Sequence, residues 1–241
     1  MKFNYKLKIK LLLIILFVIV FLILSEIKKN NENYKNNNKL GINYDFIEIG
    51  TSNFDTEIQK ADDNTIGLSV EPLKIYLDDL PNKKKCKKIN KAVSNKRDKL
   101  YIYYIKPEDI DKHKLPGYLK GCNSIINPHP LQKEELQNIN RMDLMQKKLI
   151  DVITFEDLVK SNNVNKIKLL KIDTEGHDPV ILDSVINYCD KYKHTYPDKI
   201  IFETNQWSNA DVQNEIITKF KNRNYKLIKK EHDAVLEKIK N

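Results

Sequence analysis

Short apolar runs alternate with helix-like segments along most of the chain, and this alternation constrains the fold more than any other feature. Strands are expected at residues 44–50, 65–70, 87–93, 99–105, 166–172, 199–204, 224–229 and 234–239. Helices are expected at 52–61, 154–161, 179–192 and 209–222. Strands that alternate with helices are typical of βαβ units in a mainly parallel sheet. The sequence therefore predicts an α/β sandwich with helices on both faces. Residues 106–131, with four prolines and two glycines, are expected to form a long irregular insertion.

The N-terminal part of the chain is an apolar run, Leu11–Leu24, behind a lysine-rich start. The run is shorter than the roughly 20 residues that cross a bilayer, but it reaches that length if the flanking lysines extend toward the surface. We expect a transmembrane signal-anchor at 11–27, after a basic tail at 1–10 and before a flexible polar stem at 28–40. A cleaved signal peptide and a buried helix are the alternatives. The expected protein is a single-pass membrane protein whose globular domain spans 41–241.

The net charge of +9 is of the size found in nucleic-acid-binding proteins, but it is unevenly distributed along the chain. Eight lysines and two glutamates in residues 1–40 account for +6 of it, which leaves +3 for the remaining 201 residues. The basicity is mainly a property of the tail, and the globular part shows no basic-aromatic stripe. The composition therefore disfavours a nucleic-acid partner.

Polar residues end four of the expected strands. They lie at Glu48 to Asp55, at Glu71, at Asp173 to Asp178, and at Glu203 to Asn205. In open α/β sheets, ligands bind at the carboxyl edge of the strands, so these four places are expected to converge on one site.

The first two strand ends have features of a nucleoside-binding site. Gly50 follows a strand and opens a helix, so the backbone can approach a ligand closely there. The segment is not GxGxxG, which argues against NAD. Glu71 ends the second strand, where the two oxygens of its carboxylate can accept hydrogen bonds from both hydroxyls of a ribose. A plain role at the start of the next helix is the alternative for Glu71.

At these positions the sequence resembles the FkbM family of S-adenosylmethionine-dependent methyltransferases. The resemblance covers roughly residues 44–205 and rests on the segments "FIEIGTSNFDT", "SVEP", "INKAVSN", "VITFEDL", "LLKIDTEGHDPVIL" and "IIFE". It implies a class I methyltransferase (Rossmann-like) fold with a seven-stranded sheet and one antiparallel edge strand. It also implies S-adenosylmethionine as the methyl donor and O-methylation, often of sugar hydroxyls, as the activity.

The resemblance assigns residues to the cofactor. Glu48 and Gly50 would hold its methionine end, and Ser52 lies in the same loop. Glu71 would bind the ribose, and Ala92 and Val93 would lie near adenine. Asp173 and Glu175 match the acids of the family's hallmark segment, and Ser124 matches a serine of its substrate-side loop. His177 and Asp178 stand where the family more usually has Ala and Glu.

The residues after the strand 166–172 are suited to activating an acceptor hydroxyl. A sugar hydroxyl is a poor nucleophile unless a base takes its proton. His177 has an ordinary pKa near 6.5, which suits a base, although a plain loop histidine is the alternative. Asp173 can orient the acceptor or act as the base itself, and Glu175 can hold the loop. Trp207 either stacks on a sugar ring or covers the sheet edge.

No resident metal is expected. The three cysteines are widely spaced and give neither a zinc motif nor a disulfide framework. Two acids and a histidine within one turn can bind a divalent cation, but their spacing does not demand one.

The leading hypothesis is a membrane-anchored methyltransferase that acts on a glycan or a related small hydroxyl acceptor. An anchored glycosyltransferase, with Asp109 to Asp111 as its metal motif, is a second hypothesis. A third is an inactive scaffold that keeps the fold, because the first loop retains only Gly50 of the usual glycines.

Overall fold

The computed structural model describes residues 13–28, 41–192, 195–204 and 209–239. The chain divides into two compact units, Met1–Gly41 and Ile42–Asn241. The expected basic tail 1–10, most of the expected stem and Trp207 lie outside the described residues.

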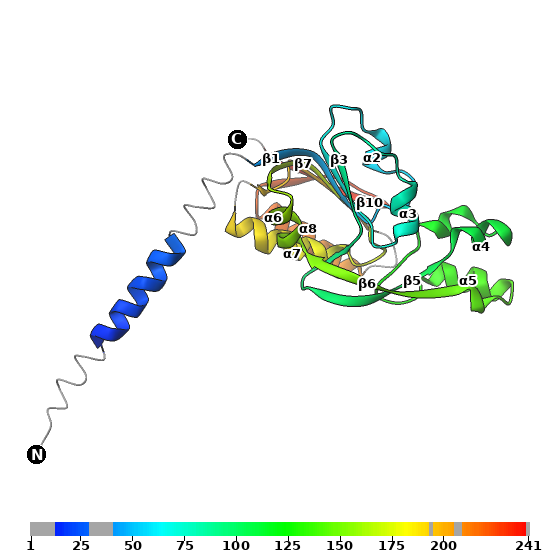
Figure 1. The fold of residues 1–241 in the computed structure, drawn as a ribbon, viewed down its shortest axis with the longest axis horizontal. Coiled ribbons are helices and arrows are strands. Elements are labelled where there is room, and N and C mark those ends of the chain that lie inside the picture. Colours follow the sequence, from blue (N-terminus) through cyan, green and yellow to red (C-terminus); the bar gives the residue numbers. More distant parts are fainter. Residues whose placement is uncertain (1–12, 29–40, 193–194, 205–208, 240–241) are drawn as a thin grey trace, which may run out of the picture. The chain divides into compact units, whose positions relative to one another are not determined.

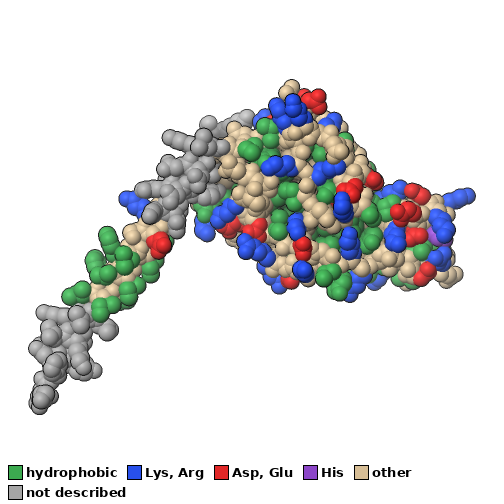
Figure 2. Space-filling view, viewed as in Figure 1, with side chains coloured by type: hydrophobic (Ala, Val, Ile, Leu, Met, Phe, Trp, Pro, Cys, Tyr) green, Lys and Arg blue, Asp and Glu red, His purple; other side chains and the backbone are tan. Residues whose placement is uncertain are grey.

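The described part of the first unit is a helix at residues 13–28. Its large apolar side chains from Leu13 to Leu24 are exposed, and Figure 2 shows them on the surface of this helix. A helix over the apolar run is therefore confirmed. Within the described segments, no helix combines the length and the apolar character that crossing a membrane requires.

Seven strands form the central sheet of the second unit (Figure 1). They are β1 (Ile42–Ile49), β2 (Gly67–Val70), β3 (Cys86–Ile89), β7 (Val164–Ile172), β8 (Lys199–Glu203), β9 (Tyr225–Lys230) and β10 (Asp233–Lys238). Their order is β3-β2-β1-β7-β8-β10-β9, and the first five strands of that order are parallel. The seven-stranded, mainly parallel sheet is confirmed. The expected position of the antiparallel strand at the edge is wrong, because β10 lies between β8 and β9 and is antiparallel to both.

The central strands are apolar because both faces of the sheet are covered. All four residues of β2 are buried, as is β1 from Phe46 to Ile49. The helices that cover the sheet are α2 (Glu57–Lys60), α3 (Lys74–Asp79), α6 (Phe155–Ser161), α7 (Asp178–Lys191) and α8 (Ala210–Lys221). In Figure 1, α2 and α3 lie on one face and α6, α7 and α8 on the other. The predicted sandwich is confirmed.

The start of α6 shows why these segments fold as expected. The Thr154 hydroxyl accepts the Asp157 N–H at 3.0 Å, and the Asp157 carboxylate accepts the Thr154 N–H at 3.1 Å. This capping box fixes the helix start at the predicted residue. Helix α2 is shorter than the expected 52–61, because Ser52 and Asp55 adopt positive φ angles and the helix begins only after Thr56.

A second, three-stranded sheet was not expected. It contains β4 (Ala92–Ser94), β5 (Asp98–Ile105) and β6 (Met145–Thr154) in the order β4-β6-β5. The single strand expected at 87–93 is therefore wrong, since it divides into β3 and β4 of different sheets. The chain turns between β3 and β4 at Asn90, whose side-chain NH₂ group donates to the carbonyls of Glu71 and Pro72, both at 2.9 Å.

Residues 106–144, which connect β5 to β6, are called the insertion here. It contains the α-helices α4 (Pro107–Lys112) and α5 (Pro130–Asn138). It also contains two short 3-10 helices, η1 (Gly117–Lys120) and η2 (Met142–Leu144). The expectation of an irregular segment is wrong in part, because Pro107 and Pro130 each begin a helix, where proline is well tolerated. Ile110, Leu119 and Leu136 form a small core within the insertion, together with Ile105 at the end of β5.

Candidate active site

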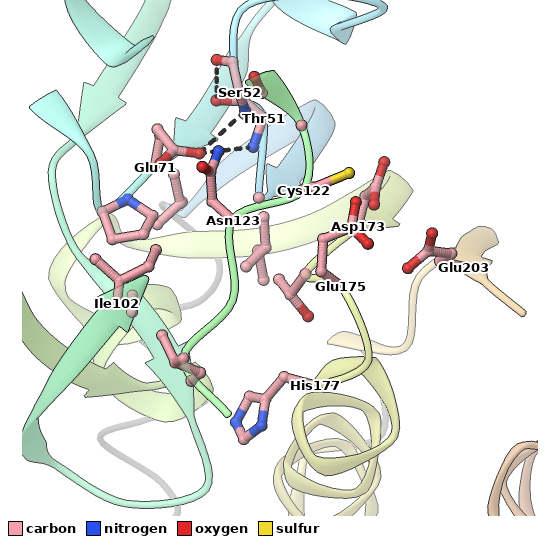
Figure 3. Close-up of a pocket in the computed structure, with 18 of the residues that line it drawn as sticks. Thr51, Ser52, Glu71, Ile102, Cys122, Asn123, Asp173, Glu175, His177 and Glu203 are labelled. Atoms are coloured by element: carbon pink, nitrogen blue, oxygen red, sulfur yellow. Dashed lines mark hydrogen bonds between the residues drawn. The ribbon is translucent and has the colours of Figure 1, made fainter. Parts of the chain in front are cut away.

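A cavity of about 400 Å³ lies at the carboxyl ends of the parallel strands. Gly50 follows β1, Glu71 follows β2, Asp173 follows β7 and Glu203 ends β8, and all four line the cavity (Figure 3). The predicted convergence of four strand ends on one site is confirmed. The volume lies within the range of small-molecule sites.

The insertion supplies one wall of this cavity. Tyr118, Cys122, Asn123, Ile125 and His129 all line it. The Ser52 hydroxyl donates to the Lys120 carbonyl at 2.9 Å, which ties the insertion to the loop after β1. The wall is therefore fixed to the strand ends rather than free of them.

Gly50 permits a close approach of two strand ends. Its φ angle is +78°, and a Cβ atom there would lie 1.8 Å from the Asp173 carbonyl oxygen. The Asp173 N–H in turn donates to the Ile49 carbonyl at 2.9 Å. The position requires glycine because the backbone of β7, as well as the cavity, lies against it.

Glu71 is buried, and three backbone N–H groups hold its carboxylate. One oxygen accepts from Thr51 at 3.1 Å and from Ser52 at 3.0 Å, and the other accepts from Leu73 at 2.8 Å. Burial raises the pKa of Glu71 to about 7, against the opposing effect of these hydrogen bonds. The residue expected to bind the ribose lines the cavity, and it also organises the loop after β1.

Glu48 is placed away from the cavity lining. Its carboxylate accepts the N–H groups of Glu57 and Ile58 at 2.6 and 3.1 Å and the Ser69 hydroxyl at 2.5 Å. Because alternate residues of a strand face opposite ways, Glu48 points toward α2 while Ile49 lines the cavity. Glu48 thus binds the start of α2 and is not among the residues that line the cavity, and its contact with the methionine end of a cofactor stays a prediction.

Ala92 and Val93 line the cavity as expected for residues near an adenine ring. Ile102 and Ile125 line it as well and extend this apolar surface. Figure 3 shows Ile102 on the side of the cavity opposite the acids that follow β7 and β8. The cavity therefore has an apolar side and an acidic side.

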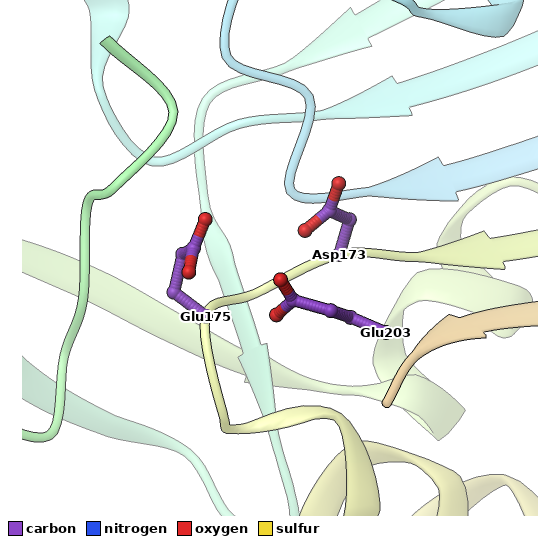
Figure 4. Close-up of side chains that lie close together, drawn as sticks. All are labelled: Asp173, Glu175 and Glu203. Carbon is purple, nitrogen blue, oxygen red and sulfur yellow. The ribbon is translucent and has the colours of Figure 1, made fainter. Parts of the chain in front are cut away.

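The acidic side consists of Asp173, Glu175 and Glu203 (Figure 4). One carboxylate oxygen from each lies within 4.8 Å of the others. Loss of surrounding water, with the nearby charges of Asp178 and Glu175, raises the pKa of Asp173 to about 8. Among the described residues, this cluster is where a divalent cation could be held, since such ions prefer carboxylate oxygens.

Glu175 occupies an uncommon backbone conformation next to the insertion. Its φ angle is +51°, and Gly176 follows with a φ of +94°. The Glu175 carboxylate lies 3.1 Å from Nε2 of His129, a histidine only 3% exposed at the start of α5.

Ser124 contacts the loop after β7 from outside the cavity lining. Its hydroxyl donates to the Glu175 carbonyl at 3.4 Å and accepts the Ile126 N–H at 3.3 Å. Ser124 therefore holds the loop after β7, and its contact with a substrate stays a prediction.

His177 lies apart from the three acids. Its Nε2 is 2.9 Å from the Ser94 hydroxyl, directly after Ala92 and Val93. Figure 3 shows its ring directed away from Asp173, Glu175 and Glu203. Burial lowers the pKa of His177, so the ring is neutral at pH 7. His177 lines the cavity as predicted, but it is placed on the side of β4 rather than beside the acids.

Asp178 is fully buried at the first turn of α7 and binds two strand ends. It accepts the Thr174 N–H at 2.8 Å, the Thr174 hydroxyl, and the Glu203 N–H at 2.9 Å. Burial raises its pKa to about 6. Asp178 thus bridges the loop after β7 and the end of β8.

Sequence reasoning placed Glu203 among the converging strand ends but gave it no role, and it did not include His129 in the site. His129 had no usable signal, since only the folding of the insertion brings it to Glu175.

The match to known families agrees with this geometry. A model of the methyltransferase FkbM domain matches residues 48–227. No curated protein matches the chain significantly. The family match includes the strand ends around the cavity, the insertion and the acidic side. The chain belongs to the FkbM methyltransferase family.

Proposed function

We propose that the chain is an S-adenosylmethionine-dependent O-methyltransferase that acts on a hydroxyl of a glycan or another small acceptor. The observation that carries this proposal is the two-sided cavity at the ends of β1, β2, β7 and β8. An apolar side and an acidic side match a ligand that joins an aromatic base to a cationic group.

The residues present fit this cofactor. Ala92, Val93 and Ile102 offer the apolar surface that a purine ring needs. Oδ1 of Asn123, on the cavity wall, is buried and has no hydrogen-bond partner among the described residues, so it is available to a ligand N–H group. The carboxyl groups of Asp173, Glu175 and Glu203 suit a positively charged centre.

Asp173 is the best-placed group to accept a proton. When bound, S-adenosylmethionine would supply an electrophilic methyl group, and S-adenosylhomocysteine would leave as the methyl–sulfur bond breaks. The Asp173 carboxylate would take the acceptor's hydroxyl proton as the new C–O bond forms. A pKa of about 8 makes this carboxylate a stronger base than an ordinary aspartate.

The insertion forms the acceptor side of the site in this proposal. Tyr118 and His129 reach the cavity from it, and His129 lies against Glu175 of the acidic side. Acceptor choice is then set by the insertion, and methyl transfer by the strand ends.

Calorimetric titration of the full chain with S-adenosylmethionine tests the cofactor assignment. We expect micromolar binding that Glu71→Gln weakens and that Glu108→Gln, at an exposed position of α4, leaves unchanged. A UDP-sugar with Mn²⁺ is the counter-ligand. Binding of the UDP-sugar instead would contradict the proposal, and binding of neither would favour the inactive scaffold.

The glycosyltransferase alternative has weak geometric support. Asp109 and Asp111, its candidate metal motif, lie on α4 and are absent from the cavity lining. Asp111 pairs with Lys120 at 2.9 Å.

We also propose that the N-terminal segment attaches the domain to a membrane as a single-pass anchor. The apolar run 11–24 and the exposed apolar surface of helix 13–28 support this. The test is flotation with liposomes of the full chain and of a chain that lacks residues 1–27. Equal flotation of both would contradict the proposal.

A further inference from the structure

Asp178 joins two chain segments that leave the sheet side by side. The last paired residues of β7 and β8 are Ile172 and Phe202. Beyond them, one oxygen of Asp178 accepts from Thr174, and the other accepts the Glu203 N–H at 2.9 Å. Asp178 is 0% exposed and lies in the first turn of α7, where the helix dipole favours a negative charge.

These hydrogen bonds fix the backbone that carries the acidic side of the cavity. Asp173 and Glu175 flank Thr174, and Glu203 is itself bound through its N–H group. The φ angle of +51° at Glu175 is a conformation that persists only when the surroundings hold it. One buried carboxylate thus sets the separation of three others.

We propose that Asp178 is a positioning residue for methyl transfer, which acts by holding Asp173, Glu175 and Glu203 in one arrangement. The inference rests on the proposed function, because it assigns the acidic side of the cavity to that reaction. Asp178 itself is absent from the cavity lining. Its effect on the reaction passes through the backbone of Thr174 and Glu203.

The variant Asp178→Asn separates positioning from folding. Asparagine has nearly the same shape but only one acceptor oxygen, so its NH₂ group faces either the Thr174 N–H or the Glu203 N–H. One of the two strand ends is then released. Asp178→Glu keeps two acceptor oxygens and serves as the conservative rescue. Asp211→Asn, in the first turn of α8 and exposed, is the matched control.

The experiment measures three quantities on the full chain and each variant. They are the thermal unfolding midpoint, the calorimetric affinity for S-adenosylmethionine, and kcat and KM for transfer of labelled methyl groups to a hydroxyl acceptor found by screening a glycan panel. For Asp178→Asn we expect kcat to fall about 10- to 100-fold. We expect the cofactor affinity to fall much less than kcat, because Gly50 and Glu71 are untouched and only the contact of the three acids with the cationic centre changes. Asp178→Glu is expected to recover part of kcat, and Asp211→Asn to match the wild type.

Two outcomes would overturn the inference while leaving the proposed function standing. One is an unchanged kcat in Asp178→Asn. The other is a cofactor affinity and a thermal unfolding midpoint that both fall as much as the activity does. That result would make Asp178 a purely structural residue. A wild-type chain that binds no S-adenosylmethionine or methylates no acceptor would instead overturn the proposed function, and the inference with it.

Discussion

The Glu71 carboxylate accepts the backbone N–H of Ser52 at 3.0 Å, and this contact joins the end of β2 to the loop after β1. The acid that the sequence assigns to a ribose therefore also shapes the loop beside the ribose position. Its protonation state couples loop structure to pH.

Glu71→Gln is expected to change how stability depends on pH. The pKa of Glu71 is raised from 4.5 to about 7, so its contribution to stability is fully present below pH 4.5 and is lost as pH rises through about 7. Glutamine does not titrate. Between pH 4.5 and 8 the free energy of unfolding of the wild type should fall by about 3 kcal/mol relative to the variant. Urea denaturation at several pH values measures this, and parallel curves for the two proteins would contradict it.

Gly50→Ala should destabilise the domain. The added Cβ would overlap the Asp173 carbonyl, and alanine at a φ of +78° is strained. We expect a loss of about 2–5 kcal/mol in the free energy of unfolding. Gly117→Ala is the matched control, because a Cβ there meets nothing within 4 Å. Equal denaturation midpoints for the two variants would show that the contact between the ends of β1 and β7 is dispensable.

Asp173→Asn should abolish most turnover and leave most of the cofactor affinity, since Glu175 and Glu203 still face the cationic centre. Loss of a positioned base lowers kcat by about 100- to 10,000-fold. In the wild type, kcat should rise as pH increases through about 8, because the proton must leave Asp173 before it can act as a base. The assay is transfer of labelled methyl groups across pH 6 to 9. If His177→Asn lost more activity than Asp173→Asn, the base would be His177.

His129→Ala should loosen the insertion. His129 begins α5, where its Nδ1 accepts the Leu131 N–H at 3.3 Å, and its Nε2 contacts Glu175. Loss of a helix cap costs about 1–2 kcal/mol. Hydrogen exchange should therefore accelerate in α5 and in the loop after β7. His232→Ala, at an exposed position, is the control, and the same exchange pattern in both variants would refute the role of His129.

The sequence predicts the sheet well because its signals are local. Apolar runs that end in acids identify β1, β2, β7 and β8, and Thr154 with Asp157 marks a helix start through contacts three residues apart. Once these strands are identified, Glu71 and Asp173 are predicted to share a cavity, since parallel strands bring their carboxyl ends to one edge of the sheet.

The parts that sequence reasoning missed depend on distant contacts. Nothing local separates β3 from β4, because the division depends on Asn90 reaching back to the carbonyls of Glu71 and Pro72. The pairing of His177 with Ser94 joins residues 83 positions apart. The direction of Glu48 toward α2 was missed as well, because an acid in a strand gives no indication of which face of the sheet it takes.

The register of β5 against β6 sets where the insertion begins and ends. Ile105, just before it, pairs directly with Met145, just after it, so the segment leaves and re-enters the scaffold at adjacent points. Its small core around Leu119 includes Ile105 of β5. Lys120 and His129 of the insertion contact Ser52 and Glu175, so a replacement segment has to keep these contacts to leave the loops after β1 and β7 in place.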